Sequence, residues 1–284
     1  MPEAKKEQVL SVRDLDITFK TTAGPVHAIR GVNIDLYKGE TVALVGESGS
    51  GKSVTMKAAM GILAKNATVN SGSIRFSYHH ADGSPETVDL LQKDKKWIRR
   101  HINGKRIAMV FQDPMASLNP RKKVEDIIGE GLDIHHLCKT QAERREKVEK
   151  ILAKVGLAPE HAERYPHQFS GGQRQRVGIA RALIMNPKLI IADECISALD
   201  VSIQAQILNL LKDLQKEFST AYLFISHDIG VIHYMSDFIV VINRGRIVEQ
   251  GEGSQLIRTP KDDYTKRLIA SSCSTGEGCV CGVR

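Results

Sequence analysis

The sequence predicts an α/β protein, and two observations support this. Short apolar runs that end in polar residues recur, as in LIIADE at 189–194 and AYLFISH at 221–227, and such runs are typical of strands buried in a parallel sheet. The segment VSIQAQILNLLKDLQKEF between them is predicted to be a helix, so the three elements form a right-handed βαβ unit. A further apolar strand at residues 42–45 leads into the stretch around which the chain is organised.

That stretch is GESGSGKS, which fits the phosphate-binding pattern GxxxxGK[ST]. It lies between the strand at 42–45 and a helix predicted over MKAAMGIL, with the positive end of that helix near Lys52. Lys52 is expected to reach the β- and γ-phosphates of a nucleotide, and the Ser53 hydroxyl to bind Mg²⁺. The alternative is a glycine-rich turn without a ligand. The residues expected to contact nucleotide are Gly46, Glu47, Ser48, Gly49, Ser50, Gly51, Lys52 and Ser53.

Composition sets broad limits on the class of protein. The chain has 284 residues, 42% of them hydrophobic, which is ordinary for a globular protein with one large or two small domains. A net charge of +7 is compatible with binding to nucleic acid, anionic lipid or a nucleotide, and does not distinguish among these partners. The chain has no apolar run suited to a signal peptide or a membrane span. Its five cysteines are too unevenly placed for a disulfide framework, so a cytoplasmic protein is expected.

The N-terminal part of the chain is expected to form antiparallel strands. Residues 9–19 and 26–36 alternate polar and apolar residues around the turn-forming TTAGP. Phe19, near the end of the first strand, is expected either to stack on an adenine base or to lie in the core. NSGSIRF predicts a turn followed by a strand, and the polar residues 77–104 predict a surface insertion.

The middle of the chain is expected to turn helical. KRIAMVFQ predicts a strand ending in Gln112, and the prolines of DPMASLNP predict irregular structure after it. Thr140 and Glu143 form a predicted capping box, which opens an amphipathic helix closed by Gly156. Further on, SGGQ precedes a predicted helix, and residues 238–251 predict a hairpin that turns at Arg244 and Gly245.

Five separated motifs together resemble the ATP-binding subunit of an ATP-binding-cassette (ABC) transporter. They are GESGSGKS, Gln112 in VFQDP, FSGGQ, LIIADE with SALD, and His227 in ISHD, and the resemblance covers about residues 9–251. It implies the fold of a P-loop NTPase (ABC ATPase), with a RecA-like mixed-sheet core, an antiparallel β subdomain and a helical signature subdomain. The expected single domain has a nucleotide-binding core at 8–112 and 188–251 and a helical subdomain at 113–187. A C-terminal helix and a flexible cysteine-containing tail are expected over 252–284.

The resemblance also implies a catalytic role for each motif. Asp193 is expected to hold Mg²⁺ together with Ser53 and Gln112. Glu194 is the expected general base that orients the attacking water, and His227 is expected near the γ-phosphate. Lys52 and Gln112 complete the expected catalytic set. For the two acids the alternative is a capped strand end, and for His227 an ordinary surface or core histidine.

The FSGGQ motif implies a second chain. Its residues start a helix that can bind the γ-phosphate, although the P-loop of the same chain already supplies one such site. The family resolves this with a head-to-tail dimer, in which FSGGQ of one subunit covers the ATP of the other, and Asp200 of SALD lies at that junction. The expected residues of this second nucleotide contact are Ser170, Gly171, Gly172, Gln173 and Asp200.

Within the family the chain resembles the branch that imports di- and oligopeptides or nickel. VGESGSGKSVT, FQDPMASLNPR and SALDVSIQAQILNLL support this, while Cys195 with Ile196 and the run PKDDYT depart from the commoner pattern. The implied partners are integral-membrane permease subunits, a second ATPase subunit (self or sister) and, indirectly, an extracellular substrate-binding protein. No nucleic acid is expected, and the implied location is the cytoplasmic face of the membrane.

Three alternative functions remain beside this interpretation, together with possible metal binding by the C-terminal cysteines. The alternatives are a nickel importer, a soluble ABC ATPase of DNA repair or translation, and a nucleotide-binding regulator without turnover. Cys273, Cys279 and Cys281 supply three thiolates where an iron–sulfur cluster needs four, so a cluster is not expected. The permease is expected to dock near DPMASLNP, on exposed residues such as Met115 and Leu118.

Overall fold

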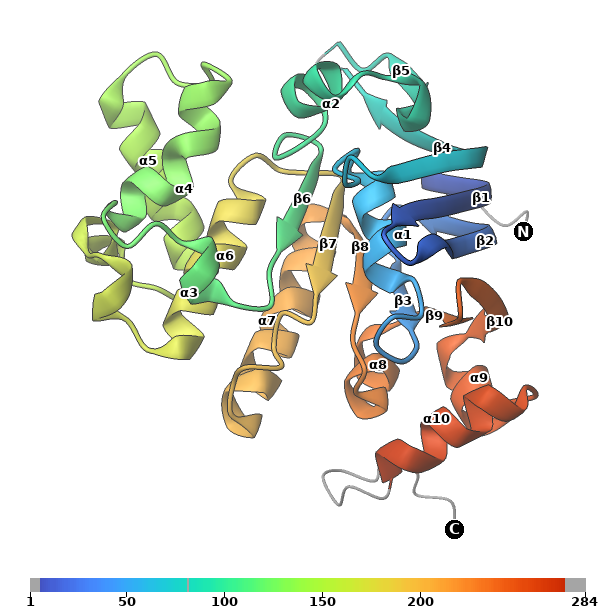
Figure 1. The fold of residues 1–284 in the computed structure, drawn as a ribbon. Helices are drawn as coiled ribbons and strands as arrows, with labels where there is room; N and C mark the ends of the chain where they lie inside the picture. The colour runs from blue at the N-terminus through green and yellow to red at the C-terminus, as the bar shows by residue number, and fades with distance from the viewer. Residues whose placement is uncertain (1–5, 81, 274–284) are drawn as a thin grey trace, which may run out of the picture. The chain divides into compact units, whose positions relative to one another are not determined.

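The protein is described here by a computed structural model, which covers residues 6–80 and 82–273. The chain divides into two compact units. The first contains residues 1–100 and 221–284, and the second contains residues 101–220. The ribbon in Figure 1 shows the elements of both units.

An antiparallel sheet of four strands, in the order β2-β1-β4-β5, opens the first unit (Figure 1). Its strands are β1 (Gln8–Thr21), β2 (Gly24–Tyr37), β4 (Ala67–His79) and β5 (Pro85–Asp89). The predicted pairing of the first two strands is confirmed, with Ser11 opposite Asp35. The predicted turn at NSG is wrong, because these residues lie inside β4 at an irregularity of its pairing with β1. Gly72 has φ 105° there, and a Cβ would approach the backbone of Leu15 to 2.7 Å.

The expected surface insertion at 77–104 is also wrong. Part of it is β5, which pairs with β4, and the rest includes η1 (Leu90–Gln92) and α2 (Lys95–His101). Val88, Leu90 and Ile98 are buried. These apolar side chains are too sparse among polar ones to give a periodic signal, which is why the sequence pattern did not reveal them.

A second set of strands in the first unit surrounds β3 (Thr41–Val45). This strand pairs in parallel with β8 (Ala221–Ile225) on one side and β9 (Phe238–Asn243) on the other. Because β3 lies between two partners, all five of its residues are buried. The antiparallel β10 (Arg246–Glu252) completes the set, and the predicted hairpin turn is confirmed by positive φ at Arg244 and Gly245.

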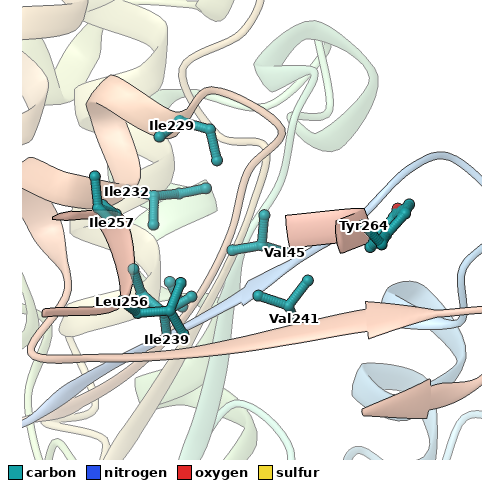
Figure 2. Packing of buried hydrophobic residues seen from close by; sticks show 9 residues of the cluster. Val45, Ile229, Ile232, Ile239, Val241, Leu256, Ile257 and Tyr264 are labelled. Carbon is teal, nitrogen blue, oxygen red and sulfur yellow. The ribbon is translucent and has the colours of Figure 1, made fainter. Parts of the chain in front are cut away.

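Besides α2, four helices lie in the described part of the first unit. They are α1 (Lys52–Ala59), α8 (Ile229–Met235), α9 (Gly253–Arg258) and α10 (Asp263–Cys273). Helix α1 begins at Lys52 as expected but stops at Ala59, short of the predicted MKAAMGIL, and Gly61 has φ 63° just beyond it. Side chains from β3, β9, α8, α9 and α10 form one apolar cluster (Figure 2).

The second unit contains the parallel pair β6 (Ile107–Val110) and β7 (Leu189–Asp193), with Val110 opposite Ala192. Its helices are α3 (Pro114–Ser117), α4 (Val124–Ile134), α5 (Gln141–Lys154), α6 (Gly171–Leu183) and α7 (Val201–Phe218), with short turns η2 (Pro159–Glu163) and η3 (Pro166–Gln168). The contacts among α4, α5 and α6 gather these three helices together (Figure 1).

Two details of the helical part differ from expectation. DPMASLNP is not irregular throughout, since Pro114 opens a helical turn whose backbone Asp113 caps by accepting from Met115 N at 2.7 Å. The Thr140 cap is confirmed at 3.1 Å to Glu143 N. The second hydrogen bond of the predicted capping box, from the Thr140 amide to the Glu143 side chain, is not formed. The Glu143 carboxylate accepts from the amide of Lys139 at 2.9 Å instead.

Candidate nucleotide-binding site

The P-loop connects β3 to α1 and owes its shape to three glycines. Gly46, Gly49 and Gly51 have φ of 153°, 79° and 117°, a range that side-chain-bearing residues rarely adopt. A Cβ at Gly46 would overlap the carbonyl oxygen of Ile242, and a Cβ at Gly51 would come within 2.7 Å of the Ile29 side chain. The loop therefore requires glycine both for conformation and for space.

Lys52 lies folded against its own loop. Its ammonium donates to the carbonyl oxygens of Gly46 at 2.6 Å and Glu47 at 2.9 Å, and the residue is only 7% exposed. These two hydrogen bonds hold the nitrogen donor of Lys52 beside the loop. Together with the start of α1, whose first turn has no acidic residue, this arrangement suits an anionic ligand.

Two hydrogen bonds connect the loop to distant residues of the first unit. The Ser50 carbonyl accepts from Gly245 N at 2.8 Å, and the Glu47 amide donates to the Tyr264 hydroxyl at 2.9 Å. The Ser50 hydroxyl is buried and has no hydrogen-bond partner among the described residues, so a donor is available for an added acceptor. These observations fit a polyphosphate, and the exposed Ser53 hydroxyl at α1 is an oxygen donor of the kind Mg²⁺ prefers.

His227 and Phe19 belong to the same unit as the P-loop. Leu44 pairs with Ile225, so β3 and β8 end side by side, and His227 follows two residues later in an exposed position. This places His227 at the same sheet edge as the start of the P-loop. Phe19 pairs with Val26 in the antiparallel sheet and is half-buried, so part of this residue is exposed.

The second unit brings three of the expected motifs together. Glu194 follows the last residue of β7 with φ 44°, a conformation that a glutamate adopts only under strain. Its carbonyl accepts from the Ser197 hydroxyl at 3.0 Å, and that hydroxyl accepts from the Gln112 side chain at 3.3 Å. The structure thus links Gln112 to the Glu194 turn through Ser197, to which sequence reasoning gave no role.

Asp193 is half-buried at the end of β7, and Gln112 is exposed. The residue after the two acids, Cys195, is fully buried, and burial raises the pKa of its thiol to about 12. An apolar, neutral Cys195 in this position supplies packing below the acids and no charge. Among the described residues, no group of three or more His, Cys, Asp and Glu side chains could hold a metal ion. Cys279 and Cys281 lie outside the described residues.

The FSGGQ residues form the N-terminus of α6, as expected. Ser170 caps the helix by accepting from Gln173 N at 3.3 Å, and the Gln173 side chain accepts from Ser170 N at 3.0 Å. A Cβ at Gly172 would lie 2.5 Å from Ile203, so glycine allows α6 to approach α7 closely. The side chains of Ser170 and Gln173 cap each other, which leaves the helix amides as the anion-binding groups of this motif.

Asp200 caps the neighbouring helix α7. Its carboxylate accepts from the Ser202 hydroxyl at 2.8 Å and from Ile203 N at 3.0 Å, and these hydrogen bonds lower its pKa. Because Ile203 also faces Gly172, Asp200 lies close to the start of α6. The two motifs expected at a subunit junction therefore share one surface of the second unit.

One of the two residues expected to contact the permease is buried. Met115 is 46% exposed, as expected, but Leu118 is 2% exposed and belongs to the core. The neighbouring Ser117 carbonyl accepts from Arg181, which ties this segment to α6. Phe111, also exposed, is a surface residue that the sequence pattern did not single out.

Comparison with known proteins gives a consistent result. A family model described as ABC transporter matches residues 29–197. The chain is 48% identical over 265 residues to the oligopeptide transport ATP-binding protein OppF of Bacillus subtilis (strain 168), covering 93% of this chain and 82% of that protein. It is 46% identical over 272 residues to the dipeptide transport ATP-binding protein DppF of Lactococcus lactis subsp. cremoris (strain MG1363), covering 95% and 82%.

Solved structures show the same fold. An ATP-binding cassette solved as a dimer in a post-hydrolysis state with ADP and Pi matches with a TM-score of 0.71 and 26% identity, over 86% of this chain and 98% of that one. The structure of cbiO1 from Clostridium perfringens, part of the ABC transporter complex cbiONQ, matches with a TM-score of 0.71 and 28% identity, over 95% and 99%. The predicted fold class is confirmed. With the P-loop geometry and these similarities together, the chain belongs to the ABC transporter family, as one of its ATP-binding subunits.

Proposed function

We propose that this protein is the ATP-hydrolysing, energy-coupling subunit of an importer of di- or oligopeptides. The observation that supports ATP hydrolysis most directly is the P-loop, in which a buried Lys52 is held by the carbonyls of Gly46 and Glu47 at the start of a helix. Phosphoryl transfer depends mainly on positioning and on charge stabilisation, and this loop provides both.

Each expected residue has a distinct task in this proposal. Lys52 and the amides of residues 48–51 bind the β- and γ-phosphates, and Phe19 offers a partly exposed ring to the base. Ser53, Gln112 and Asp193 would hold Mg²⁺, which when bound neutralises charge on the phosphates. The oxygen atoms of these three side chains are ligands of the kind that this cation prefers.

Glu194 and His227 act on the attacking water and the γ-phosphate. Glu194 accepts a proton from the water and orients it, while His227 stabilises charge on the γ-phosphate. The strained Glu194 backbone is held by Ser197, whose hydroxyl also accepts from Gln112. A change at Gln112 therefore has a short route of hydrogen bonds to the candidate base.

The second phosphate-binding helix supports a paired assembly. Ser170, Gly171, Gly172 and Gln173 start α6, and the nearby Asp200 caps α7. In the proposed head-to-tail dimer these residues cover the ATP held by the other subunit, which is this protein or a sister subunit. Closing and opening of the pair would move the permease.

The cargo and the location follow from the relatives. Proteins 46–48% identical to this chain are named for oligopeptide or dipeptide transport, which favours peptides over nickel. No helix in the described part of the chain is long and apolar enough to span a membrane. From the transport systems for which these relatives are named, we propose that the subunit lies at the cytoplasmic face of the membrane, bound to permease subunits that receive peptide from an extracellular binding protein.

Glu194→Gln tests the catalytic proposal. The glutamine keeps the size and reach of Glu194 but lacks its proton affinity, so phosphate release should slow by about a hundredfold or more while ATP binding persists. In ATP the variant should elute as a dimer on size-exclusion chromatography, because blocked hydrolysis also blocks opening. The control is Glu160→Gln, which alters an exposed carboxylate of η2 and should behave like wild type.

Several outcomes would contradict the proposal. Wild-type protein without ATP turnover, alone or with its permease, would indicate a regulator. A Glu194→Gln variant with normal turnover would remove Glu194 as the base. A monomer in saturating ATP, both alone and with the sister subunit added, would exclude the paired assembly.

The cargo is tested by uptake in a strain that lacks this gene. Complementation with the wild-type gene should restore uptake of a radiolabelled tetrapeptide, and the Lys52→Ala gene should not. Uptake of radiolabelled nickel should be the same in all strains. Loss of nickel uptake with normal peptide uptake would instead support the nickel importer.

A further inference from the structure

The C-terminal helix α10 contacts the phosphate-binding loop through one tyrosine. The Glu47 amide donates to the Tyr264 hydroxyl at 2.9 Å, although the two residues are 217 positions apart in the sequence. Tyr264 is 8% exposed, and its ring belongs to the apolar cluster that includes Val45 and Val241, the neighbouring strand residues at the start of the loop (Figure 2). The second residue of the P-loop is thus held by a helix from the far end of the described chain.

The start of α10 is itself attached to the strand set. Glu249 on β10 accepts from the amides of Lys261 at 2.9 Å and Asp262 at 3.1 Å. Asp262 in turn accepts from Tyr264 N at 2.8 Å. Tyr264 is therefore positioned both by its ring in the cluster and by backbone hydrogen bonds at the helix start.

The hydrogen bond acts on the same peptide group that holds Lys52. The peptide between Gly46 and Glu47 is planar and trans, so its carbonyl and its amide point in opposite directions. The carbonyl of Gly46 accepts from the Lys52 ammonium at 2.6 Å, and the amide of Glu47 donates to Tyr264. A partner that fixes the amide direction also fixes the direction of the carbonyl.

We infer that Tyr264 is a positioning residue for the nucleotide site, which orients the Gly46–Glu47 peptide and through it the Lys52 ammonium. The inference rests on the proposed ATP-binding function. It gives the C-terminal helix a role in nucleotide affinity that the motifs of the nucleotide site do not include. Without the tyrosine hydroxyl, the Glu47 amide loses this acceptor, and the orientation of the peptide is less restricted.

Tyr264→Phe tests this directly, because it removes the hydroxyl and keeps the ring. We expect the dissociation constant of a fluorescent ATP analogue to rise about fivefold to tenfold, the effect of losing one hydrogen bond to a buried amide. KM for ATP should rise similarly while kcat changes less, since Glu194 is unaffected. Amide exchange of the P-loop should quicken, while exchange in β1 and β2 stays unchanged. The control Tyr78→Phe removes a buried hydroxyl that bonds to Glu86 in the antiparallel sheet, and should leave ATP affinity unchanged.

A double-mutant cycle separates positioning from simple loss of stability. If Tyr264 acts through Lys52, then Tyr264→Phe should change the dissociation constant less than about twofold in a Lys52→Ala background. If the two substitutions raised the dissociation constant independently, so that their factors multiplied in the double variant, the inference would be overturned. Unchanged ATP affinity in the Tyr264→Phe single variant would also overturn it. If Tyr264→Phe fails to fold, Glu249→Gln displaces the start of α10 while leaving the hydroxyl, and unchanged ATP affinity there would also overturn it. Wild-type protein that binds no ATP would refute the proposed function instead.

Discussion

At the scale of single residues, two of the expected site residues lie in unusual environments, one in each unit. Lys52 is a buried cation whose charge is satisfied by loop carbonyls. Glu194 has a backbone conformation that suits glycine and not glutamate. Strain of this kind persists only where surrounding contacts maintain it, and at Glu194 the Ser197 hydroxyl provides one of them. We therefore expect the glutamate side chain at this position to serve function and not stability.

A Glu194→Gly variant should be more stable than wild type and inactive. Because glycine adopts the left-handed conformation without strain, the substitution should raise the free energy of unfolding by about 1–2 kcal/mol. The greater freedom of glycine in the unfolded chain should lower it again by about 0.5–1 kcal/mol. The expected rise in melting temperature is about 1–3 °C for a protein of this size. Glu194→Gln, which keeps the strained backbone, is the matched control and should show no rise. A glycine variant that melts below the glutamine variant would show that the Glu194 backbone stores no strain.

At the scale of elements, the C-terminal helix depends on a carboxylate from a neighbouring strand. Burial raises the pKa of Glu249, but the hydrogen bonds from the Lys261 and Asp262 amides outweigh it, and the net pKa is below the usual 4.5. A carboxyl whose pKa is lower in the folded state stabilises the fold above its unfolded pKa. That stabilisation is lost as the pH falls from about 4.5 through the folded pKa.

The pH dependence of α10 should therefore change in Glu249→Gln. In wild type, hydrogen-exchange protection at the start of α10 should fall as the pH drops below about 4.5. A glutamine has a single acceptor oxygen and no titration, so the variant should show weaker protection at pH 7 and no such fall. Glu252→Gln is the control, because that carboxylate accepts from the Ser254 hydroxyl of α9 at 3.0 Å. Equal pH profiles in wild type and Glu249→Gln would contradict the role of Glu249.

At the scale of the whole molecule, the proposed importer requires the nucleotide site to communicate with a permease. Gln112 is linked to the Glu194 turn, and three residues later Met115 is 46% exposed beside α6, where Arg174 contacts its sulfur. The segment that follows β6 therefore joins Gln112, a candidate catalytic residue, to the exposed side chain of Met115. We place permease docking on Met115 and Phe111, and exclude the buried Leu118.

Met115→Ala should uncouple transport from ATP hydrolysis. Loss of an exposed apolar contact should reduce peptide uptake by about fivefold or more, on the scale of a central interface residue, while basal ATPase activity of the isolated subunit is unchanged. The control is Ile134→Ala, which removes a side chain 65% exposed at the end of α4. Equal loss of uptake and ATPase activity in Met115→Ala, with the fold intact, would argue against docking at this surface.

The sequence alone determined those parts of the protein that depend on neighbours in the chain. The P-loop is one example, since its glycines, Lys52, the strand before it and the start of the helix after it are close in sequence and appear as predicted. The Thr140 cap and the turn at Arg244 and Gly245 are others. Each is a local preference of backbone or side chain, so the pattern of residue types was enough.

Only the tertiary structure decided the features that join distant segments. The polar stretch after β4 became part of a sheet because β5 pairs with β4, and Leu118 became core because it packs within the second unit. The link from Gln112 through Ser197 spans 85 positions, and the link from Glu47 to Tyr264 spans 217. A residue pattern shows which groups a segment offers, but the partner of a buried amide depends on which elements the fold brings beside it. For that reason the sequence could indicate the candidate catalytic groups, while the structure was needed to show what holds them in position.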